Sequence, residues 1–338
     1  MYSKPMARKR IGVIGCGQWG PNQIRSFFFH TRTQVVRICD TDSARLEANQ
    51  ALFPSIQTTN NFEDITRSPD IDAVVITTPV STHFKIAQDA LSHGKDVLCE
   101  KPLTIHVKES EELALLAEQK KLILMVGHVF LFNPGIVELK RLIDANEMGD
   151  LHYLHAQRTN LGPVRHDVNA VYDLASHDLS IFNFLLGAKP KVLSATAKCY
   201  LQKSVEDVAF ISLEYPGNVL THIHVSWLDP KKVRQITVVG TKKMMTWNDL
   251  SLTGPVEIYS KHVEKGPYYR DFGEFNLLVK EGEVKIPFIK NTEPLKQQAD
   301  HFVDCISNRT RPLADAQSAV EVVSTLEEIQ EILEKSRR

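Results

Sequence analysis

Two groups of residues in this chain have the types and spacing to carry out acid–base chemistry. Asp173 and His177 lie four residues apart, so on a helix their side chains would share one face. A carboxylate beside a histidine can fix the ring tautomer and raise its basicity. Lys101 lies just after the expected strand 96–99, where a lysine could stabilise negative charge on a reacting oxygen. We therefore expect Lys101, Asp173 and His177 to be catalytic, with either Lys101 or His177 as the base.

A glycine pattern near the start of the chain predicts a dinucleotide site. The apolar run 11–14 leads into Gly15-x-Gly17-x-x-Gly20, and Asp40 ends a second apolar run twenty residues after Gly20. Strand, glycine turn, helix, strand and acid in this order are typical of a unit that binds a pyrophosphate at the helix N-terminus. Asp40 favours NAD over NADP, because a carboxylate accepts bonds from ribose hydroxyls and repels a 2′-phosphate.

Further polar residues precede the expected helix 171–186 and could contact a substrate. Arginine and asparagine suit phosphate and sugar hydroxyls, although a loop also carries solvated charge with no such role. Trp227 ends an expected strand and could stack on a ring or fill the core. The candidate substrate contacts are Lys101, Arg158, Asn160, Arg165, Asn169, His177 and Trp227. No metal is expected, because His152, His155, His222 and His224 alternate along strands without an acidic or cysteine partner.

The elements that must position these residues change in character along the chain. Strands are expected at 10–14, 34–39, 73–77, 96–99 and 122–126, with helices at 21–29, 43–52, 82–92 and 107–119 between them. Such alternation predicts a parallel sheet covered on both faces. Helices at 134–145 and 171–186 then accompany strands at 151–158, 191–199, 207–215, 219–227, 235–239 and 244–247, and the tail 294–335 is helical with a break at Pro312. We expect an α/β protein with a nucleotide domain at 1–127 and an α+β domain at 128–338, built on a large, open-faced, mostly antiparallel sheet.

Composition limits the classes of partner. The chain has 338 residues, 43% of them hydrophobic, and a net charge of −1, which gives no basic field to attract nucleic acid. No segment approaches the roughly 20 apolar residues of a membrane span. The basic residues before position 11 precede only four apolar residues, so export is not expected. Five scattered cysteines without a paired motif fit a reducing, cytoplasmic compartment.

Four motifs in order resemble the Gfo/Idh/MocA oxidoreductase family. They are the glycine fingerprint 15–20, Thr77-Thr78-Pro79 with Thr82-His83, the tripeptide Glu100-Lys101-Pro102, and Asp173-x-x-x-His177. The resemblance covers nearly the whole chain and implies a Rossmann domain followed by an open-faced sheet used for substrate binding. It implies NAD as cofactor, bound by Gly15, Gly17, Gln18, Trp19, Gly20, Asp40, Thr78, Pro79, His83, Glu100 and Lys101.

A narrower likeness concerns the substrate. The runs 157–162, 165–170 and 224–230 are similar to family members that act on nucleotide-linked sugars in lipid A and surface-glycan pathways. The reaction this implies is NAD-dependent oxidation of UDP-N-acetylglucosamine to its 3-keto form. Oxidation of the corresponding uronate, reduction of a dTDP-linked 3-keto sugar, and oxidation of a free sugar or inositol are alternatives.

The resemblance also implies partners. A 3-keto sugar would pass to a sugar aminotransferase, and the open-faced sheet would assemble a homodimer or homotetramer. An alternative of another class is a non-catalytic NAD-dependent sensor, because a Rossmann fold does not guarantee catalysis. The presence of Lys101, Asp173 and His177 argues for an enzyme.

Overall fold

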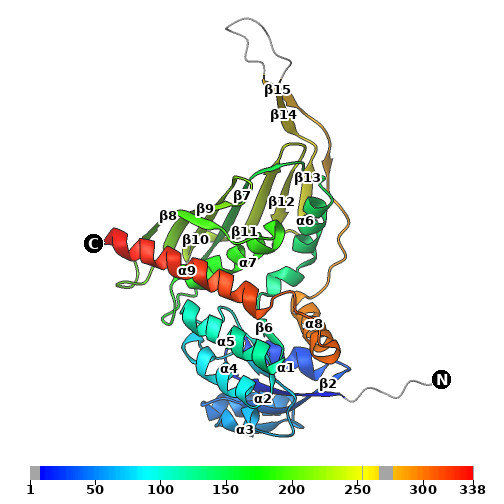
Figure 1. Ribbon diagram of the computed structural model, residues 1–338, viewed down its shortest axis with the longest axis vertical. Helices are drawn as coiled ribbons and strands as arrows, with labels where there is room; N and C mark the ends of the chain where they lie inside the picture. Colours follow the sequence, from blue (N-terminus) through cyan, green and yellow to red (C-terminus); the bar gives the residue numbers. More distant parts are fainter. Residues whose placement is uncertain (1–7, 253, 266–276, 338) are drawn as a thin grey trace, which may run out of the picture. The chain divides into compact units, whose positions relative to one another are not determined.

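Two compact units make up the part of the chain that the computed structural model describes, residues 8–252, 254–265 and 277–337 (Figure 1). The first unit extends to Phe132 and also takes Thr292–Glu327. The second takes Asn133–Asn291 and the chain after Glu327.

The first unit contains a six-stranded, wholly parallel sheet. Its order is β3-β2-β1-β4-β5-β6. The strands are β1 (Lys9–Ile14), β2 (Thr33–Cys39), β3 (Gln57–Thr59), β4 (Ala73–Ile76), β5 (Asp96–Cys99) and β6 (Leu124–Val126). All residues of β4, β5 and β6 are buried, as expected of short strands covered on both faces. The strand order reverses between β1 and β4, where ligands bind at the carboxyl ends of strands in open α/β sheets.

Helices connect these strands, as the alternating pattern predicts. They are α1 (Gly20–Phe28), α2 (Ser43–Leu52), α3 (Glu63–Thr66), α4 (His83–Ser92) and α5 (Val107–Lys120), with 3-10 turns η1 (Val80–Thr82) and η2 (Val129–Phe132). Helix α1 buries Ile24 and Phe27 on one face. The Rossmann prediction is therefore confirmed in strand order and in connectivity.

Part of the C-terminal tail belongs to the first unit rather than to the second, where the predicted boundary at 127/128 would place it. Helix α8 (Pro294–Asn308) lies wholly in the first unit, and α9 (Ala316–Arg337) begins there. The rings of Phe27 and Phe302 meet edge to face at 6.1 Å, and Ala314 O accepts a bond from Val126 N at 2.8 Å. Long-range packing of this kind leaves no local signal in the sequence.

An eight-stranded, mostly antiparallel sheet forms the second unit and confirms the predicted α+β architecture. Its order is β16-β13-β12-β11-β7-β10-β9-β8, and only β7 and β10 pair in parallel. The strands are β7 (Leu151–Leu161), β8 (Lys191–Lys198), β9 (Val208–Tyr215), β10 (Val219–Ser226), β11 (Leu228–Gly240), β12 (Met244–Asn248), β13 (Val256–Tyr259) and β16 (Val284–Lys285).

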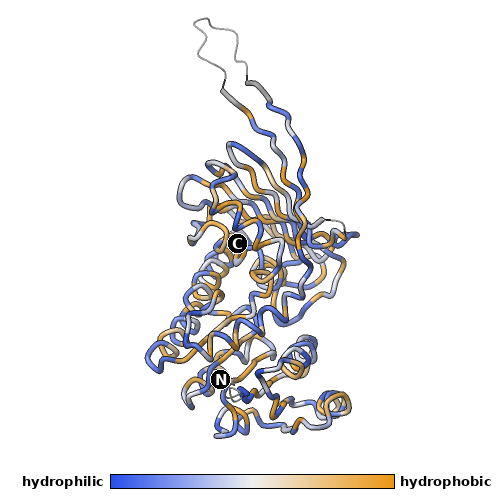
Figure 2. Tube along the Cα trace, turned by 90° about the vertical axis from the view of Figure 1, so that its right-hand side faces the viewer, coloured by the Kyte–Doolittle hydropathy of each residue, from blue (hydrophilic) through white to orange (hydrophobic). Residues whose placement is uncertain are grey.

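In the described part of the chain, the helices of the second unit lie along one face of this sheet. Helices α6 (Pro134–Asp144) and α7 (Ser176–Leu186) lie along that face (Figure 1). Buried and less buried residues alternate along β9 and β10, which is the pattern of a sheet with one covered face, and the strands carry hydrophilic as well as hydrophobic residues (Figure 2). Tyr153, Phe210 and Leu220 are exposed on β7, β9 and β10.

Several elements were not predicted. The short strands β3, β13 and β16 and the short helix α3 are among them. A separate two-stranded ribbon, β14 (His262–Lys265) and β15 (Leu277–Lys280), extends from the second unit (Figure 1). Strand β11 is longer than the predicted 235–239, and its register with β7 is irregular between Leu228 and Val233. Strands this short or irregular are fixed by their neighbours rather than by their own pattern.

Within residues 8–252, 254–265 and 277–337, no helix combines the length and the apolar character that crossing a membrane requires. Four of the five free cysteines, Cys16, Cys39, Cys99 and Cys305, are buried.

Candidate functional site

The glycine turn after β1 is built from two glycines that the fold itself requires. Gly15 has a φ of +100°, and a Cβ there would lie 2.7 Å from the carbonyl carbon of Thr77. A Cβ on Gly20 would lie 2.2 Å from the carbonyl oxygen of Gly15. Neither position can hold a larger residue without moving backbone, so these two glycines close the turn against β4.

Gly17 has a different environment, which fits a bound ligand. A Cβ built there would meet only Arg45 Nη1, at 3.5 Å. Helix α1 begins directly after Trp19 without a side-chain cap. Pro21 has no N–H, and Asn22 N and Gln23 N donate to Trp19 O at 3.1 Å, which leaves Gly20 N as the donor of this turn that can face an anion. Gln18 and Trp19 are exposed on this loop. The open space at Gly17 and the uncapped helix suit the pyrophosphate of a dinucleotide, as predicted.

Asp40 lies at the end of β2 and holds the glycine turn. Its Oδ2 accepts a bond from Cys16 N at 2.6 Å, and its Oδ1 accepts one from Asp42 N at 2.9 Å. Arg45 Nη1 lies 3.9 Å from Asp40 Oδ2. The carboxylate therefore shapes the turn through backbone bonds, and each oxygen keeps a lone pair for a ribose hydroxyl.

The residues after β4 form a hydrogen-bonded turn beside Gly15. Thr77 Oγ1 donates to Gly15 O at 2.6 Å, and Thr82 Oγ1 donates to Thr78 Oγ1 at 2.7 Å. His83, predicted to bind the cofactor, is buried, and its two ring nitrogens lie 2.9 Å from the carbonyl oxygens of Thr78 and Pro102. Its ring thus joins the turn after β4, which carries Thr78 and Pro79, to the turn after β5.

Glu100 and Lys101 follow β5 at the carboxyl edge of the sheet. Glu100 accepts a bond from Gln23 Nε2 at 3.1 Å and one from its neighbour Lys101 N at 3.3 Å. Burial raises the pKa of the Glu100 carboxyl, against the lowering effects of the Gln23 bond and the Lys101 charge. Lys101 itself is half-buried. The Glu100 carboxylate thus fixes the backbone of the predicted catalytic lysine by accepting a hydrogen bond from Lys101 N.

His128 follows β6 beside this turn. Burial lowers the pKa of its ring to about 3, with a smaller contribution from the Lys101 charge. The ring is therefore neutral near pH 7.

In the second unit, the predicted helix 171–186 begins with a wider turn. Residues Val171–Ala175 form a π-helical turn, η3, and α7 begins at Ser176. Asp173 therefore lies on the π-turn and His177 on the α-helix, so the regular four-residue spacing on one α-helix does not apply. π-turns of this kind are frequent at functional sites.

The carboxylate of Asp173 is held by two side chains from elsewhere in the second unit. Trp227 Nε1 donates to Asp173 Oδ2 at 3.2 Å, and Arg165 Nη1 donates to Asp173 Oδ1 at 3.4 Å. Arg165 also forms two bonds with Asp167, at 2.6 and 2.9 Å. Trp227 is buried, which gives it a packing and positioning role rather than the open ring face expected of a stacking residue.

Three predicted substrate contacts are engaged inside the second unit. Arg158 is buried and paired with Asp178. Asn160 Nδ2 donates to Gly162 O. Asn169 accepts a bond from Tyr172 N at 3.0 Å and donates to Glu206 and Gln330 at 2.7 and 2.8 Å. The sequence pattern predicted substrate contacts at these residues but could not show that their polar groups bond within the second unit.

Two glutamines that sequence reasoning missed are linked to Glu100, the neighbour of Lys101. Gln23 Nε2 contacts Glu100 and, at 3.4 Å, Gln298 Oε1. Both glutamines are buried. A possible signal was a polar residue on the buried stripe of an amphipathic helix, since Gln23 precedes Ile24 on α1 and Gln298 precedes Ala299 on α8.

The histidines on the second sheet form a stack. His155 and His222 are paired in register, and their Nδ1 atoms lie 3.2 Å apart. Among the residues that the structure describes, no group of three or more His, Cys, Asp or Glu side chains could hold a metal ion.

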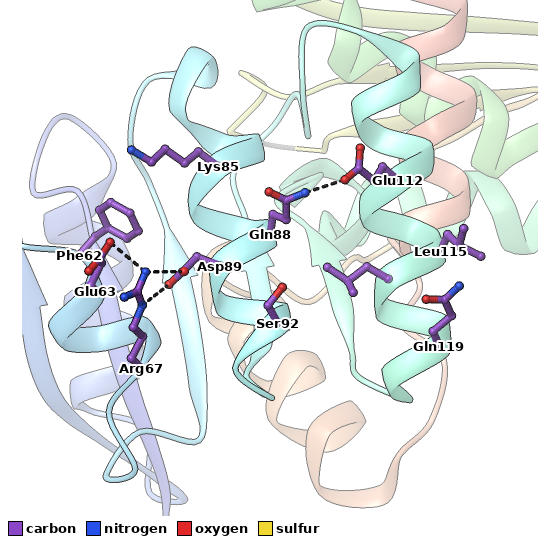
Figure 3. A pocket seen from close by; sticks show the side chains of 11 residues that line it. Phe62, Glu63, Arg67, Lys85, Gln88, Asp89, Ser92, Glu112, Leu115 and Gln119 are labelled. Atoms are coloured by element: carbon purple, nitrogen blue, oxygen red, sulfur yellow. Dashed lines mark hydrogen bonds and ion pairs between the residues drawn. The ribbon is translucent and has the colours of Figure 1, made fainter.

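A surface groove of about 480 Å³ lies between α3, α4 and α5, away from the predicted site residues (Figure 3). Its charges are largely paired: Arg67 contacts Glu63 at 2.9 Å and Asp89 at 3.0 Å. Gln88 Nε2 donates to Glu112 Oε1 at 2.6 Å. Because none of the predicted site residues lines this groove, it is not the candidate site.

Comparison with known families agrees with the two units. Residues 9–128 match the family described as "Oxidoreductase family, NAD-binding Rossmann fold", and residues 136–246 match "GFO/IDH/MocA C-terminal domain". The two matches together cover more than half of the chain.

Individual relatives include dehydrogenases of different substrates. A 1-carboxy-3-chloro-3,4-dihydroxycyclohexa-1,5-diene dehydrogenase from Comamonas testosteroni is 30% identical over 191 residues, 52% of this chain and 47% of that protein. A UDP-N-acetylglucosamine 3-dehydrogenase from Acidithiobacillus ferrooxidans is 31% identical over 191 residues, 55% of this chain and 56% of that protein. The chain thus spans about half the length of these curated relatives.

A solved structure of the Acidithiobacillus ferrooxidans UDP-N-acetylglucosamine 3-dehydrogenase has the same fold. It aligns with a TM-score of 0.82 and 22% identity over 98% of this chain and 99% of that one.

Proposed function

The chain belongs to the Gfo/Idh/MocA family of oxidoreductases with an NAD-binding Rossmann fold, and from this membership we propose that it is an NAD-dependent dehydrogenase of a nucleotide sugar. The reaction proposed is oxidation of UDP-N-acetylglucosamine to UDP-3-keto-N-acetylglucosamine. The 31% identity to a dehydrogenase of that sugar and the likeness of the runs 157–162, 165–170 and 224–230 to members that act on nucleotide-linked sugars support this substrate.

One observation carries the redox part of the proposal. The glycine turn leaves space at Gly17, where a Cβ would meet only Arg45, next to an uncapped helix N-terminus. Lys101 follows β5 of the same parallel sheet. A dinucleotide site and a cationic side chain at the carboxyl edge of one sheet suit hydride transfer from an alcohol.

The chain's own residues supply binding and proton transfer. The turn 15–20 and Asp40 would hold the dinucleotide, whose nicotinamide would supply the hydride acceptor for oxidation of the sugar carbon. His177 takes the proton of the reacting hydroxyl, and Lys101 donates a hydrogen bond to the same oxygen as negative charge develops there. Asp173, held by Trp227 and Arg165, supports the protonated form of His177.

The test is direct. The purified protein is mixed with NAD and UDP-N-acetylglucosamine, absorbance is followed at the NADH band, and loss of two hydrogens from the sugar is measured by mass spectrometry. A sugar aminotransferase with its amino donor draws off the keto product. NADH formation that requires the sugar and is lost in Lys101→Met would support the proposal.

If UDP-N-acetylglucosamine is not oxidised, the alternative substrates are tested in the same assay. Turnover of the UDP-linked uronate, of a dTDP-linked 3-keto sugar, or of a free inositol or cyclic diol would keep the chemistry and replace the substrate. The relative that acts on a dihydroxycyclohexadiene makes the cyclic diol a specific alternative. NADH binding without turnover of any of these would favour the sensor.

The cellular setting follows from the same proposal. A 3-keto sugar is a substrate for an aminotransferase, so we propose that such an enzyme consumes the product in the cytoplasm. The exposed residues Tyr153, Phe210 and Leu220 on the second sheet support assembly into a homodimer or homotetramer. Native mass spectrometry would give the number of subunits.

A further inference from the structure

A buried ion pair lies directly behind the helix that carries His177. Arg158 on β7 and Asp178 on the first turn of α7 are both buried, with side-chain exposures of 3% and 2%. We propose that this pair is a positioning device, which fixes the first turn of α7 against the second sheet and so sets where the His177 ring points. The proposal rests on the catalytic role of His177 given above.

The geometry of the pair leaves little freedom. Arg158 Nε lies 3.0 and 3.2 Å from the two carboxylate oxygens of Asp178, and Arg158 Nη2 lies 2.8 Å from Oδ1. A planar guanidinium that bonds both oxygens fixes the orientation of the carboxylate as well as its distance. A lysine could supply the charge but not the planar pair of N–H donors that bonds both oxygens.

The strand that carries Arg158 is itself fixed. β7 lies inside the sheet, between β11 and β10, and Arg158 is in register with Arg234 on one side and Val225 on the other. Asp178 directly follows His177 in the chain. The ion pair between Arg158, on an interior strand, and Asp178, the neighbour of His177, therefore fixes the position of α7 relative to the sheet.

Stability alone is a poor explanation for such a pair. Removing two charges from water costs free energy that their attraction often only just offsets, and well-packed apolar residues can replace a buried pair without loss of stability. Buried ionic groups can instead contribute a unique arrangement, which is the role proposed here.

The turn before His177 needs such a constraint. Residues 171–175 are π-helical, and a π-turn rotates the following helix relative to a regular α-helix. Asp173 is held by Trp227 and Arg165 upstream of His177, and Asp178 is held by Arg158 downstream of it. His177 thus lies between two anchored carboxylates, and loss of the downstream anchor frees the ring to reorient.

The first test uses turnover. Asp178→Asn, which keeps the shape and removes the charge, should lower kcat by about tenfold or more while the KM for NAD changes little, as expected when a base is misplaced rather than lost. The kcat of Arg158→Lys should lie between the kcat of wild type and that of Arg158→Met. Arg234→Met is the matched control, because Arg234 forms an ion pair in the same unit, with Asp249 at 3.0 Å, and should leave kcat within about twofold of wild type.

A double variant separates positioning from stability. Arg158→Met with Asp178→Leu replaces the pair by apolar residues and should restore the Tm lost in Arg158→Met. If the pair positions His177, kcat of the double variant stays low although Tm recovers. A double variant with wild-type Tm and wild-type kcat would overturn the proposal.

A spectroscopic readout does not depend on the substrate. The imidazole signals of His177 in histidine-labelled protein, assigned by their loss in His177→Asn, should move in Asp178→Asn and stay in place in Arg234→Met. Unmoved His177 signals in Asp178→Asn would overturn the proposal even if turnover fell. If wild type oxidised none of the sugars, the proposed function would fail while this measurement still decided the role of the pair.

Discussion

At the scale of single residues, the proposed chemistry needs a base and a cation on the reacting oxygen. We predict that Lys101→Met and His177→Asn each lower kcat by at least about 10², the effect of losing one acid–base or oxyanion contact. Exposed Lys85 and His152 give the matched controls Lys85→Met and His152→Asn, which should retain turnover. Steady-state kinetics with the active sugar measure this, and near-normal kcat in either site variant would remove that residue from the mechanism.

The glycines of the turn give a second residue-scale prediction, because a Cβ would meet backbone at Gly15 and Gly20 but only Arg45 at Gly17, where we propose that the dinucleotide binds. Gly17→Ala should fold with an unchanged Tm but bind NADH at least about tenfold more weakly, since its Cβ would occupy the space left for the pyrophosphate. Gly20→Ala should lose about 1–3 kcal/mol of stability, because its Cβ would overlap Gly15 O.

Thermal unfolding and NADH fluorescence titration measure the two effects separately. Weak NADH binding by Gly20→Ala alone, with tight binding by Gly17→Ala, would show that the dinucleotide does not approach Gly17.

Single residues also show which features of the candidate site could not be predicted from the sequence. The glycine spacing and the position of Lys101 after a strand follow from local pattern, and the structure agrees with both. Arg158 and Asn169 belong to a polar loop-like segment whose composition suits a ligand, but burial depends on which strands lie above and below. That information is long-range, so their inward orientation could not be predicted.

At the scale of elements, segments marked by an apolar run or a helix cap were predicted closely, and polar segments without such a mark were not. Strand β5 and helix α2 have the predicted ends, because apolar residues and the Asp42 N-cap mark them. Strand β3, Gln-Thr-Thr, carries no apolar pattern and exists because β2 offers it a partner. The π-turn η3 likewise was not predicted, because the apolar pattern of 171–186 is that of one continuous helix.

The start of that helical segment gives an element-scale prediction. Asn169 caps it through Tyr172 N and also donates to Glu206 and Gln330. Asn169→Ser keeps a capping oxygen and should cost about 1 kcal/mol or less. Asn169→Asp also caps, but it replaces the bond to buried Glu206 by the repulsion of two carboxylates and should cost about 1–3 kcal/mol.

Urea unfolding of the two variants at pH 7.5 makes the comparison. Equal stabilities, or a more stable Asn169→Asp, would contradict the network described around Asn169.

At the scale of the whole molecule, the two units share the C-terminal tail in a way that the sequence did not reveal. A boundary read along the chain assigns residues 292–327 to the domain that precedes them, whereas their apolar residues pack within the first unit. The number and class of the two units follow from alternating and antiparallel patterns. Which unit a terminal helix joins depends on packing between segments more than 200 residues apart.

Acidification should destabilise the protein through histidines that the fold keeps neutral. Burial lowers the pKa of His128 to about 3, and burial likewise lowers the pKa of His30 and His301, although nearby aspartates act in the opposite direction. In the unfolded chain these rings have a pKa near 6.5. As the pH falls below that value, the unfolded state binds protons that the folded state does not bind. The contribution of these histidines to the free energy of unfolding is therefore fully present above about pH 6.5 and is lost as the pH falls toward the folded pKa.

The contribution of His128 can be isolated, because its shift predicts a loss of about 2 kcal/mol between pH 7.5 and pH 5. Glu100 acts in the opposite direction, since burial raises its pKa and the folded state binds its proton first, so the total change is smaller than the sum over histidines. His128→Gln removes only the first effect. The free energy of unfolding in urea should therefore fall more steeply with pH in wild type than in His128→Gln, and parallel curves would mean that the folded protein accepts a proton at His128.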